Sequence, residues 1–370
     1  MAPPSGTTAR AELASRPALG PLGEVFPDVR RIAVLRGGGL GDLLFALPAI
    51  HALAATYPGA RIVLLGSAEH AELLGHRPGP VHEVVVVAEQ GSADSEVEQR
   101  LGRIDLGVQL HGGGAWSNPF LTSLRPRWTV GSRAAGAAPL SRVLPFRYYQ
   151  HETLRALEVV GLAGAAPVLL EPRLESTPSD RSAADQVLRG LRGPIAAMHP
   201  GARDPRRRWP PDRFAEVAAH CLDRDLAVVI LGSESDRDLV DDLRSRIGAR
   251  VPCPVRDRQV RAVLGAPLPA LCGVLARSAI FVGNDSGPRH LARAFGTPTV
   301  GIFWIGNVIN AGPLGRARDR VLMSWTTACP VCHRDCTDEE LPRCPHDVSF
   351  VAGVRTADVR RDIDDLLDHR

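Results

Sequence analysis

The chain of 370 residues contains no lysine, so its 44 fixed positive side chains are all arginines. Any site for an anion must therefore be built from arginine, histidine, backbone N–H groups and helix ends. The 41 acidic residues leave a net charge of only +3, which gives no electrostatic case for binding to nucleic acid.

Long apolar runs are also missing, because no window approaches the roughly 20 apolar residues that span a bilayer. Residues 1–27 are rich in Ala, Pro, Gly, Ser and Arg and lack the apolar core of a signal peptide. We therefore expect residues 1–30 to form a disordered N-terminal tail and the protein to be cytoplasmic.

The dinucleotide-binding fingerprint is absent as well. An apolar strand over residues 31–36 leads into Gly37-Gly38-Gly39-Leu40-Gly41-Asp42 and then into a helical stretch over 43–57. The required 1-3-6 spacing of glycines fails at every starting point, which disfavours a nicotinamide or flavin enzyme. Strand, glycine loop and helix are nevertheless the opening of a doubly wound α/β domain.

What the sequence does contain is a repeated alternation of apolar strands and helical segments on both sides of an Ala- and Pro-rich linker over 163–178. This pattern predicts an α/β fold with two Rossmann-like, doubly wound domains, over residues 31–175 and 176–354, that face each other across a cleft. The interdomain cleft is the expected site. A last helix over 355–370 has one apolar face, and we expect it to pack back on the first domain.

One stretch carries a specific signal for an anion. Residues 279–296 predict a buried strand, the turn Asn284-Asp285-Ser286-Gly287-Pro288 and a helix start. The backbone N–H groups from Ser286 onward lack intrahelical partners and can bind an anion. Arg289 and His290 oppose the helix dipole, a penalty that a bound phosphate would reverse. An ordinary turn with a surface histidine remains the alternative.

Four of the seven cysteines are clustered, with the spacing C-x2-C-x3-C-x7-C: Cys329, Cys332, Cys336 and Cys344. Four soft ligands can hold a tetrahedral Zn or Fe ion, and a cytoplasmic location favours metal over disulfides. With four protein ligands the site would be structural, because no position stays open for a substrate. Reduced thiols in a loop are the alternative.

Three segments in this order and spacing make the chain resemble a known family: Gly39-Leu40-Gly41-Asp42 with Leu47-Pro48-Ala49, Arg207-Arg208-Trp209-Pro210 with Phe214, and Gly283 to Pro288 with His290. The chain is similar to the ADP-heptose:lipopolysaccharide heptosyltransferases, glycosyltransferase family 9, of GT-B fold. The resemblance covers residues 31–370. It implies inverting transfer of a heptose, or a similar sugar, from an ADP-sugar to an acceptor hydroxyl, with no cofactor required for catalysis.

The resemblance also implies roles for individual residues. Asp42 matches a general base that takes the proton of the acceptor hydroxyl, although an aspartate there can also cap the following helix. The second domain would bind the nucleotide sugar and the first domain the acceptor. On the donor side stand Asp285, Ser286, Gly287, Pro288, His290, Arg207 and His199, with Arg207 where the family often has lysine; on the acceptor side stand Gly39, Gly41, His111, Trp116 and Asn118.

The implied partners are an ADP-sugar donor and a glycan or another hydroxyl acceptor. A lipid-linked acceptor would bring the protein to a membrane surface as a peripheral protein. Alternatives are the same donor chemistry on a protein or a small natural product, a non-catalytic sugar-nucleotide-binding protein, and a redox or metal sensor that rests on the cysteine cluster alone.

Overall fold

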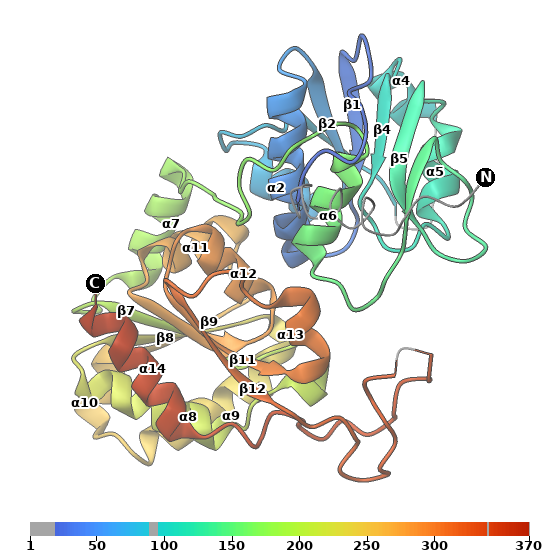
Figure 1. Cartoon of the computed structure of the whole chain (residues 1–370). Coiled ribbons are helices and arrows are strands. Elements are labelled where there is room, and N and C mark those ends of the chain that lie inside the picture. The colour runs from blue at the N-terminus through green and yellow to red at the C-terminus, as the bar shows by residue number, and fades with distance from the viewer. Residues whose placement is uncertain (1–18, 89–94, 339, 370) are drawn as a thin grey trace.

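The computed structural model describes residues 19–88, 95–338 and 340–369. These residues form two six-stranded sheets, each flanked by helices, and the two sheets belong to separate halves of the molecule (Figure 1). We call the elements from β1 to α6 the first unit and those from α7 to α14 the second unit. No helix in this part of the chain is long and apolar enough to cross a membrane.

The first unit contains a parallel sheet with the strand order β3-β2-β1-β4-β5-β6. Its strands are β1 (Arg31–Leu35), β2 (Arg61–Gly66), β3 (Glu83–Val86), β4 (Leu106–Gln109), β5 (Trp128–Arg133) and β6 (Arg142–Pro145). Its helices are α2 (Leu40–Thr56), α3 (Ala68–Leu74), α4 (Ser95–Leu101), α5 (Ser117–Ser123) and α6 (Glu152–Gly161). The central strands β1, β2 and β4 are mostly apolar, because most of their side chains are buried on both faces of the sheet.

Strand β1 illustrates this double burial. Ile32 and Val34 belong to the apolar cluster that includes residues of α2 and α6. Ala33 and Leu35 belong to a second cluster, with residues of α4 and α5. Successive side chains of a strand point to opposite faces, so one five-residue strand contributes to both layers.

The second unit contains a parallel sheet with the order β12-β11-β10-β7-β8-β9. Its strands are β7 (Ile195–His199), β8 (Ala227–Gly232), β9 (Val260–Leu264), β10 (Ile280–Asn284), β11 (Thr299–Trp304) and β12 (Asp319–Ser324). Its helices are α7 (Pro178–Leu188), α8 (Pro211–Asp223), α9 (Arg237–Gly248), α10 (Cys253–Gln259), α11 (Leu268–Arg277), α12 (Gly287–Ala294), α13 (Ile305–Ala311) and α14 (Thr356–Asp368).

Both sheets have the same order when each is numbered from its own first strand. The chain reverses direction across the sheet between β1 and β4 in the first unit, and between β7 and β10 in the second. Ligands of doubly wound sheets bind outside the carboxyl ends of strands at such reversal points. The loops after β1, β7 and β10 are therefore the places where the fold favours a ligand, and the expected α/β architecture of two doubly wound halves is confirmed.

The two units touch each other beside the cleft. Helix α2 packs on α12, and one apolar cluster runs from residues of α2 to residues of α7, α11 and α12. Close by, Arg77 in the loop after α3 forms an ion pair with Asp180 on α7 at 2.7 Å, and both side chains are almost completely buried. The halves are thus joined by apolar packing and by a buried pair of charges.

The C-terminal helix does not lie where the sequence analysis expected it. Helix α14 packs on α8 and on strands β10, β11 and β12 of the second unit, and its residues Val359, Ile363 and Leu366 share a cluster with Trp209 and Phe214. The expected packing on the first domain is therefore wrong. The reason is that α8 contacts β8, which leaves the same face of β10 to β12 to be covered by another helix.

The expected N-terminal tail over 1–30 lies outside the described residues up to residue 18. The described remainder is packed on the first unit, contrary to the expectation of disorder. Phe26 is 6% exposed, stacks on Trp128 with ring centroids 4.9 Å apart, and donates its N–H to Tyr57 Oη at 3.1 Å.

Candidate active site

A cavity of about 1050 Å³ lies between the two units, at the carboxyl ends of the central strands. Its lining combines the first turn of α2 with the loops after β7 and β10. The predicted residues that it brings together are Gly39, Gly41, Asp42, His199, Arg207, Asp285, Ser286, Gly287, Pro288 and His290. Residues of the expected acceptor side and of the expected donor side therefore face one space.

Asp42 lies in the first turn of α2, and the glycines before it shape its position. Gly38 has a φ of +86°, and a Cβ there would stand 2.5 Å from Asp42 Oδ2, so the turn requires glycine on both grounds. Asp42 Oδ2 accepts the N–H of Gly39 at 3.0 Å, which is the capping role. Its side chain remains 44% exposed, so capping and a role in the cavity are compatible.

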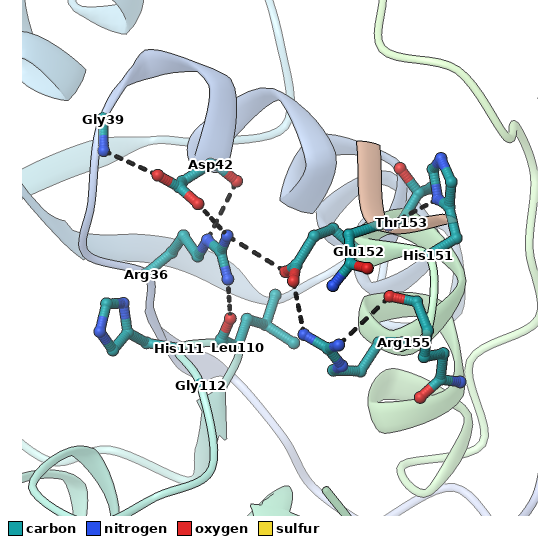
Figure 2. A network of polar contacts seen from close by, with 12 residues as sticks. Arg36, Gly39, Asp42, Leu110, His111, Gly112, His151, Glu152, Thr153 and Arg155 are labelled. Carbon is teal, nitrogen blue, oxygen red and sulfur yellow. Dashed lines mark hydrogen bonds and ion pairs between the residues drawn. The ribbon is translucent and has the colours of Figure 1, made fainter. Parts of the chain in front are cut away.

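Behind Asp42 lies a chain of charges that the sequence analysis missed (Figure 2). Arg36, the first residue after β1, is 6% exposed and places Nη2 2.7 Å from Asp42 Oδ1 and 3.4 Å from Glu152 Oε2. Its Nη1 donates to the carbonyl of Leu110 at the end of β4. Glu152, at the start of α6, lines the cavity and forms a second ion pair with Arg155 at 2.6 Å.

On the facing wall, Asn284 holds three loops together at the end of β10. Its buried side chain accepts the N–H of Trp209 at 3.0 Å and donates to the carbonyl of Pro200 at 2.7 Å. The next residue, Asp285, is 4% exposed and contacts Arg207 Nη1 at 3.2 Å and His290 Nε2 at 3.1 Å. The loop over residues 204–210, which carries three consecutive arginines and which we call the arginine loop, is thereby fixed to the turn after β10.

The N-terminus of α12 opens into the cavity. Ser286 is its N-cap residue but makes no side-chain cap, because its Oγ lies 3.0 Å from His199 Nδ1. A Cβ added to Gly287 would meet nothing within 4 Å, so the space in front of the first turn is open. Arg203, Arg207 and Arg208 line the same cavity. Free backbone N–H groups beside guanidinium groups suit a multiply charged anion.

The two histidines of this wall are buried and uncharged near neutral pH. Burial lowers the pKa of His199 to about 4, and burial together with the charge of Arg289 lowers the pKa of His290 to about 4. Burial alone would raise the pKa of Asp285, but the hydrogen bond from His290 and the charges of Arg289 and Arg207 outweigh it and hold that pKa below its usual value. His290 therefore does not bring the positive charge that we expected in the first turn.

Arg289 is buried away from the cavity lining. Its guanidinium lies 4.4 Å from the ring centroid of Phe303 and donates to the carbonyl of Ala311 at 3.0 Å. Burial lowers the pKa of Arg289 to about 10, so it stays charged at neutral pH.

Three predicted acceptor-side residues are not among the described residues that line the cavity: His111, Trp116 and Asn118. Asn118 is fully buried, and its amide donates to the carbonyl of Ala138 at 2.9 Å, so its predicted contact with an acceptor is wrong. The rings of His111 and Trp116 lie 5.1 Å apart just after β4 and are partly exposed, and their role stays a prediction.

The cysteine cluster is brought together with one change. Cys329, Cys332, Cys344 and His346 place one ligand atom each within 4.8 Å of all the others. Cys336 is not in this group, and its Sγ contacts the carbonyl oxygen of Arg334 at 3.4 Å. The group that the structure brings together therefore differs from the predicted set of four thiols at one position, where His346 takes the place of Cys336.

Comparison with known proteins agrees with this architecture. The model of glycosyltransferase family 9 (heptosyltransferase) matches residues 125–341. Lipopolysaccharide heptosyltransferase 2 of Escherichia coli strain K12 is 24% identical over 290 residues, which cover 74% of this chain and 82% of that protein.

Two solved structures share the fold. A glycosyl transferase family 9 protein from Veillonella parvula DSM 2008 has a TM-score of 0.74 at 20% identity, covering 92% of this chain and 98% of its own. ADP-heptose lps heptosyltransferase II of E. coli has a TM-score of 0.69 at 18% identity, covering 92% and 99%. With a family match over more than half of its length and this two-sheet GT-B fold, the chain belongs to glycosyltransferase family 9, the heptosyltransferases, and is a glycosyltransferase.

Proposed function

We propose that this enzyme transfers a heptose, or a closely similar sugar, from an ADP-sugar to an acceptor hydroxyl with inversion at the anomeric carbon. The observation that carries the proposal is that the partly exposed carboxylate of Asp42 and the uncapped N-terminus of α12 line one cavity. A relative of the same fold is named for ADP-heptose, which supports the donor.

The donor diphosphate would lie at the N–H groups that begin at Ser286 and Gly287, with Arg207 beside it. As the sugar leaves, negative charge grows on ADP, and fixed N–H dipoles and guanidinium groups are suited to stabilise that charge without a metal. Arg207 is paired with Asp285 at 3.2 Å, so one guanidinium would join the diphosphate to Asp285, whose carboxylate would contact the hydroxyls of the donor sugar. His199 and His290, both neutral near pH 7, would act as hydrogen-bonding groups.

The acceptor would enter from the first unit, beside Gly39 and Gly41. Its hydroxyl oxygen attacks the anomeric carbon, the bond from that carbon to the β-phosphate oxygen breaks, and the hydroxyl proton moves to Asp42. A single displacement inverts the anomeric centre. We propose a glycan acceptor, since the relatives are named as lipopolysaccharide heptosyltransferases, and a lipid-linked glycan would place the enzyme at a membrane surface as a peripheral protein. A protein or a small natural product is the alternative acceptor.

Calorimetric titration tests the donor half of the proposal. We expect the protein in metal-free buffer to bind ADP in preference to UDP, GDP and NAD. The substitution Gly287→Val adds a side chain at a position where a Cβ would meet no protein atom within 4 Å, so it should weaken ADP binding at least tenfold and leave the fold intact. Gly353→Val, at another open position outside the cavity lining, is the matched control. Equal or absent binding of all four nucleotides would overturn the proposal.

A second test follows the sugar itself. Incubation with ADP-heptose and candidate acceptors should release ADP and yield a product whose anomeric configuration, measured by NMR, is opposite to that of the donor. Retention of configuration would contradict a single displacement with Asp42 as base.

We also propose that Cys329, Cys332, Cys344 and His346 hold a structural Zn²⁺ or Fe ion. Neighbouring ligand atoms are 3.2 to 3.7 Å apart, and three thiols with one imidazole are a usual tetrahedral donor set. The N–H of Val331 points to Cys329 Sγ at 3.4 Å, as backbone amides do beside metal-bound thiolates. Four protein ligands leave no open position, so the ion would supply folding energy and no chemistry.

The part of the chain that holds this cluster contacts the arginine loop of the donor wall. Phe350 donates its N–H to the carbonyl of Arg206 at 2.7 Å, and Ser349 Oγ donates to the carbonyl of Arg208 at 2.6 Å. Arg343 forms an ion pair with Asp204 at 3.2 Å. A bound metal would therefore steady the backbone on both sides of Arg207.

A further inference from the structure

We propose that Glu152 is a positioning residue that raises the proton affinity of Asp42 by sharing the charge of Arg36 with it. The inference rests on the proposed function, in which Asp42 accepts the proton of the acceptor, and it assigns a task to Glu152, another carboxylate that lines the same cavity.

The first step is the position of Arg36 between two carboxylates. Its Nη2 lies 2.7 Å from Asp42 Oδ1 and 3.4 Å from Glu152 Oε2 (Figure 2). The guanidinium has little freedom to follow either of them, because Nη1 donates to the carbonyl of Leu110 and Nε donates to the backbone carbonyl of Asp42 at 3.0 Å. Arg36 is thus a fixed, buried cation with one partner on each side.

The second step is the fixed position of Glu152. Its Oε1 lies 2.6 Å from Arg155 Nη1. Arg155 is held in turn by three backbone carbonyls, at Arg147, Tyr148 and Gln150, which its Nη2 reaches at 2.7, 3.0 and 3.2 Å. If Glu152 turned toward solvent, the guanidinium of Arg155 would lose its carboxylate partner. Two carboxylates and two guanidinium groups make a set of four charges that sum to zero.

The third step is what happens when Asp42 takes up a proton. With Arg36 as its single charged neighbour, protonation would leave a buried cation without a counter-ion, and this would oppose proton uptake. With Glu152 at 3.4 Å, Arg36 keeps an anionic partner when Asp42 becomes neutral, and the set then carries one net positive charge instead of the two that it would carry without Glu152. Glu152 therefore makes Asp42 a better base than an isolated arginine–aspartate pair would be.

Other charged or titratable groups also face Asp42 and must be weighed. His70 on α3 contacts the carbonyl of Gly39 at 3.2 Å, and burial lowers its pKa; Glu69 precedes it on the exposed side. His290 stands beside Gly41 and is neutral near pH 7. Arg203 reaches to within 3.7 Å of where a Cβ of Gly39 would stand, but it is exposed, so solvent screens its charge. The buried cation in direct contact with Asp42 is Arg36, which pairs in turn with Glu152.

The test measures proton binding by Asp42 directly and needs no acceptor. The whole protein is labelled with carboxyl-13C aspartate, and the resonance of Asp42 is identified by its absence in Asp42→Asn. Glu152→Gln removes one negative charge while keeping the size of the side chain. We expect Asp42 to bind its proton less tightly in this variant than in the wild type, because one negative charge beside Arg36 is gone. Glu158→Gln, on the same helix but bonded to Gln150, is the matched control and should leave the midpoint unchanged.

The same variants separate this inference from its rivals. In transfer assays with ADP-heptose, Glu152→Gln should move the acid limb of kcat/KM to lower pH and reduce the plateau several-fold, while Glu152→Asp restores the limb. An unchanged midpoint in a folded Glu152→Gln variant would overturn the inference, and so would a higher acceptor KM with an unmoved acid limb. Neither result touches the proposed function, which fails instead if Asp42→Asn retains full turnover.

Discussion

Asp42 is a single residue on which the proposed chemistry can be tested. Asparagine in its place can still accept the N–H of Gly39, which lies 3.0 Å from Oδ2, but it cannot take up a proton. We expect Asp42→Asn to lower turnover by about 100-fold to 10,000-fold, the usual contribution of a general base, and to leave ADP affinity nearly unchanged. Steady-state rates and calorimetry on the same samples check this. Asp238→Asn, in the first turn of α9, is the control.

The buried histidines predict how stability depends on pH. The pKa of His290 falls from 6.5 unfolded to about 4 folded, so the unfolded chain binds more protons between these values. Stability is therefore fully retained above about pH 6.5 and is lost as pH falls toward 4, by up to about 3 kcal/mol for this imidazole. His290→Gln removes the titration and keeps a donor for Asp285.

Urea unfolding between these two pH values measures the effect. The variant should lose less stability than the wild type on acidification. Parallel curves would mean that His290 is protonated equally in both states, and would contradict the burial argument.

Single residues also show what the sequence could predict. Asp42, Asp285 and Ser286 could be placed at the cavity from sequence because each lies between the end of a buried strand and the first turn of the next helix, which is where doubly wound sheets bind ligands. Arg36 and Glu152 were missed because their contact joins the loop after β1 to the start of α6, and nothing local to either residue indicates that pairing. A charged residue directly after a buried strand was the available signal for Arg36.

The folded-back segment after β12 makes a prediction at the scale of an element. Cys332 belongs to the cluster of possible ligands and Cys336 does not. We expect elemental analysis to find about one metal ion per chain in the wild type and in Cys336→Ser, and far less in Cys332→Ser. Equal metal content in the two variants, or no metal in the wild type, would contradict the proposed donor set.

The same variants report on the arginine loop. Because Phe350 and Ser349 hold the carbonyls on both sides of Arg207, loss of metal in Cys332→Ser should weaken ADP binding while Cys336→Ser binds as the wild type does. Loss of sugar transfer from ADP-heptose without loss of folded structure would fit this role. A variant that responds to oxidants at unchanged metal content would favour a redox sensor instead.

Helices and strands with a clear hydrophobic periodicity were predicted close to their observed bounds. The surfaces against which they pack were not predicted. The helix expected over 43–57 is α2 (Leu40–Thr56), and the apolar run before the Asn-Asp-Ser-Gly-Pro turn is β10 (Ile280–Asn284). The apolar face of α14 was recognised, but its partner was wrong, because an amphipathic pattern states that a face is buried and leaves open which surface covers it.

At the scale of the whole molecule, the buried pair between Arg77 and Asp180 joins the two units and can be tested by substitution. Removal of one partner leaves the other charge buried and unpaired, so Arg77→Ala should lower the free energy of unfolding by about 3 to 5 kcal/mol. Arg61→Ala is the control, because Arg61 forms a half-exposed pair with Glu83 that is worth at most about 1 kcal/mol. Denaturant titration measures the free energy of unfolding of both variants. Similar losses of stability in the two would contradict the burial of the pair between Arg77 and Asp180.

The two-sheet architecture as a whole was predictable because strand–helix units repeat on both sides of a linker. How the halves meet was not predictable, since it depends on close approach at single positions such as Gly41, where a Cβ would stand 3.1 Å from the His290 ring. Close contacts between residues of different elements leave no periodic pattern in the sequence from which they could be predicted.

The packing of α2 on α12 also restricts how the cavity can open. Phe45 meets the His290 ring edge-on with centroids 4.7 Å apart, directly beside the cavity. If this contact persists while the halves move, the motion is a rotation about a pivot at α2 and α12. Asp42 and Ser286 lie on the elements that form the pivot and would change their separation little, whereas Glu72 and Gly265, which line the cavity on other elements of the two units, would travel farther. The enzyme could then admit and release large substrates while its reacting groups stay in register.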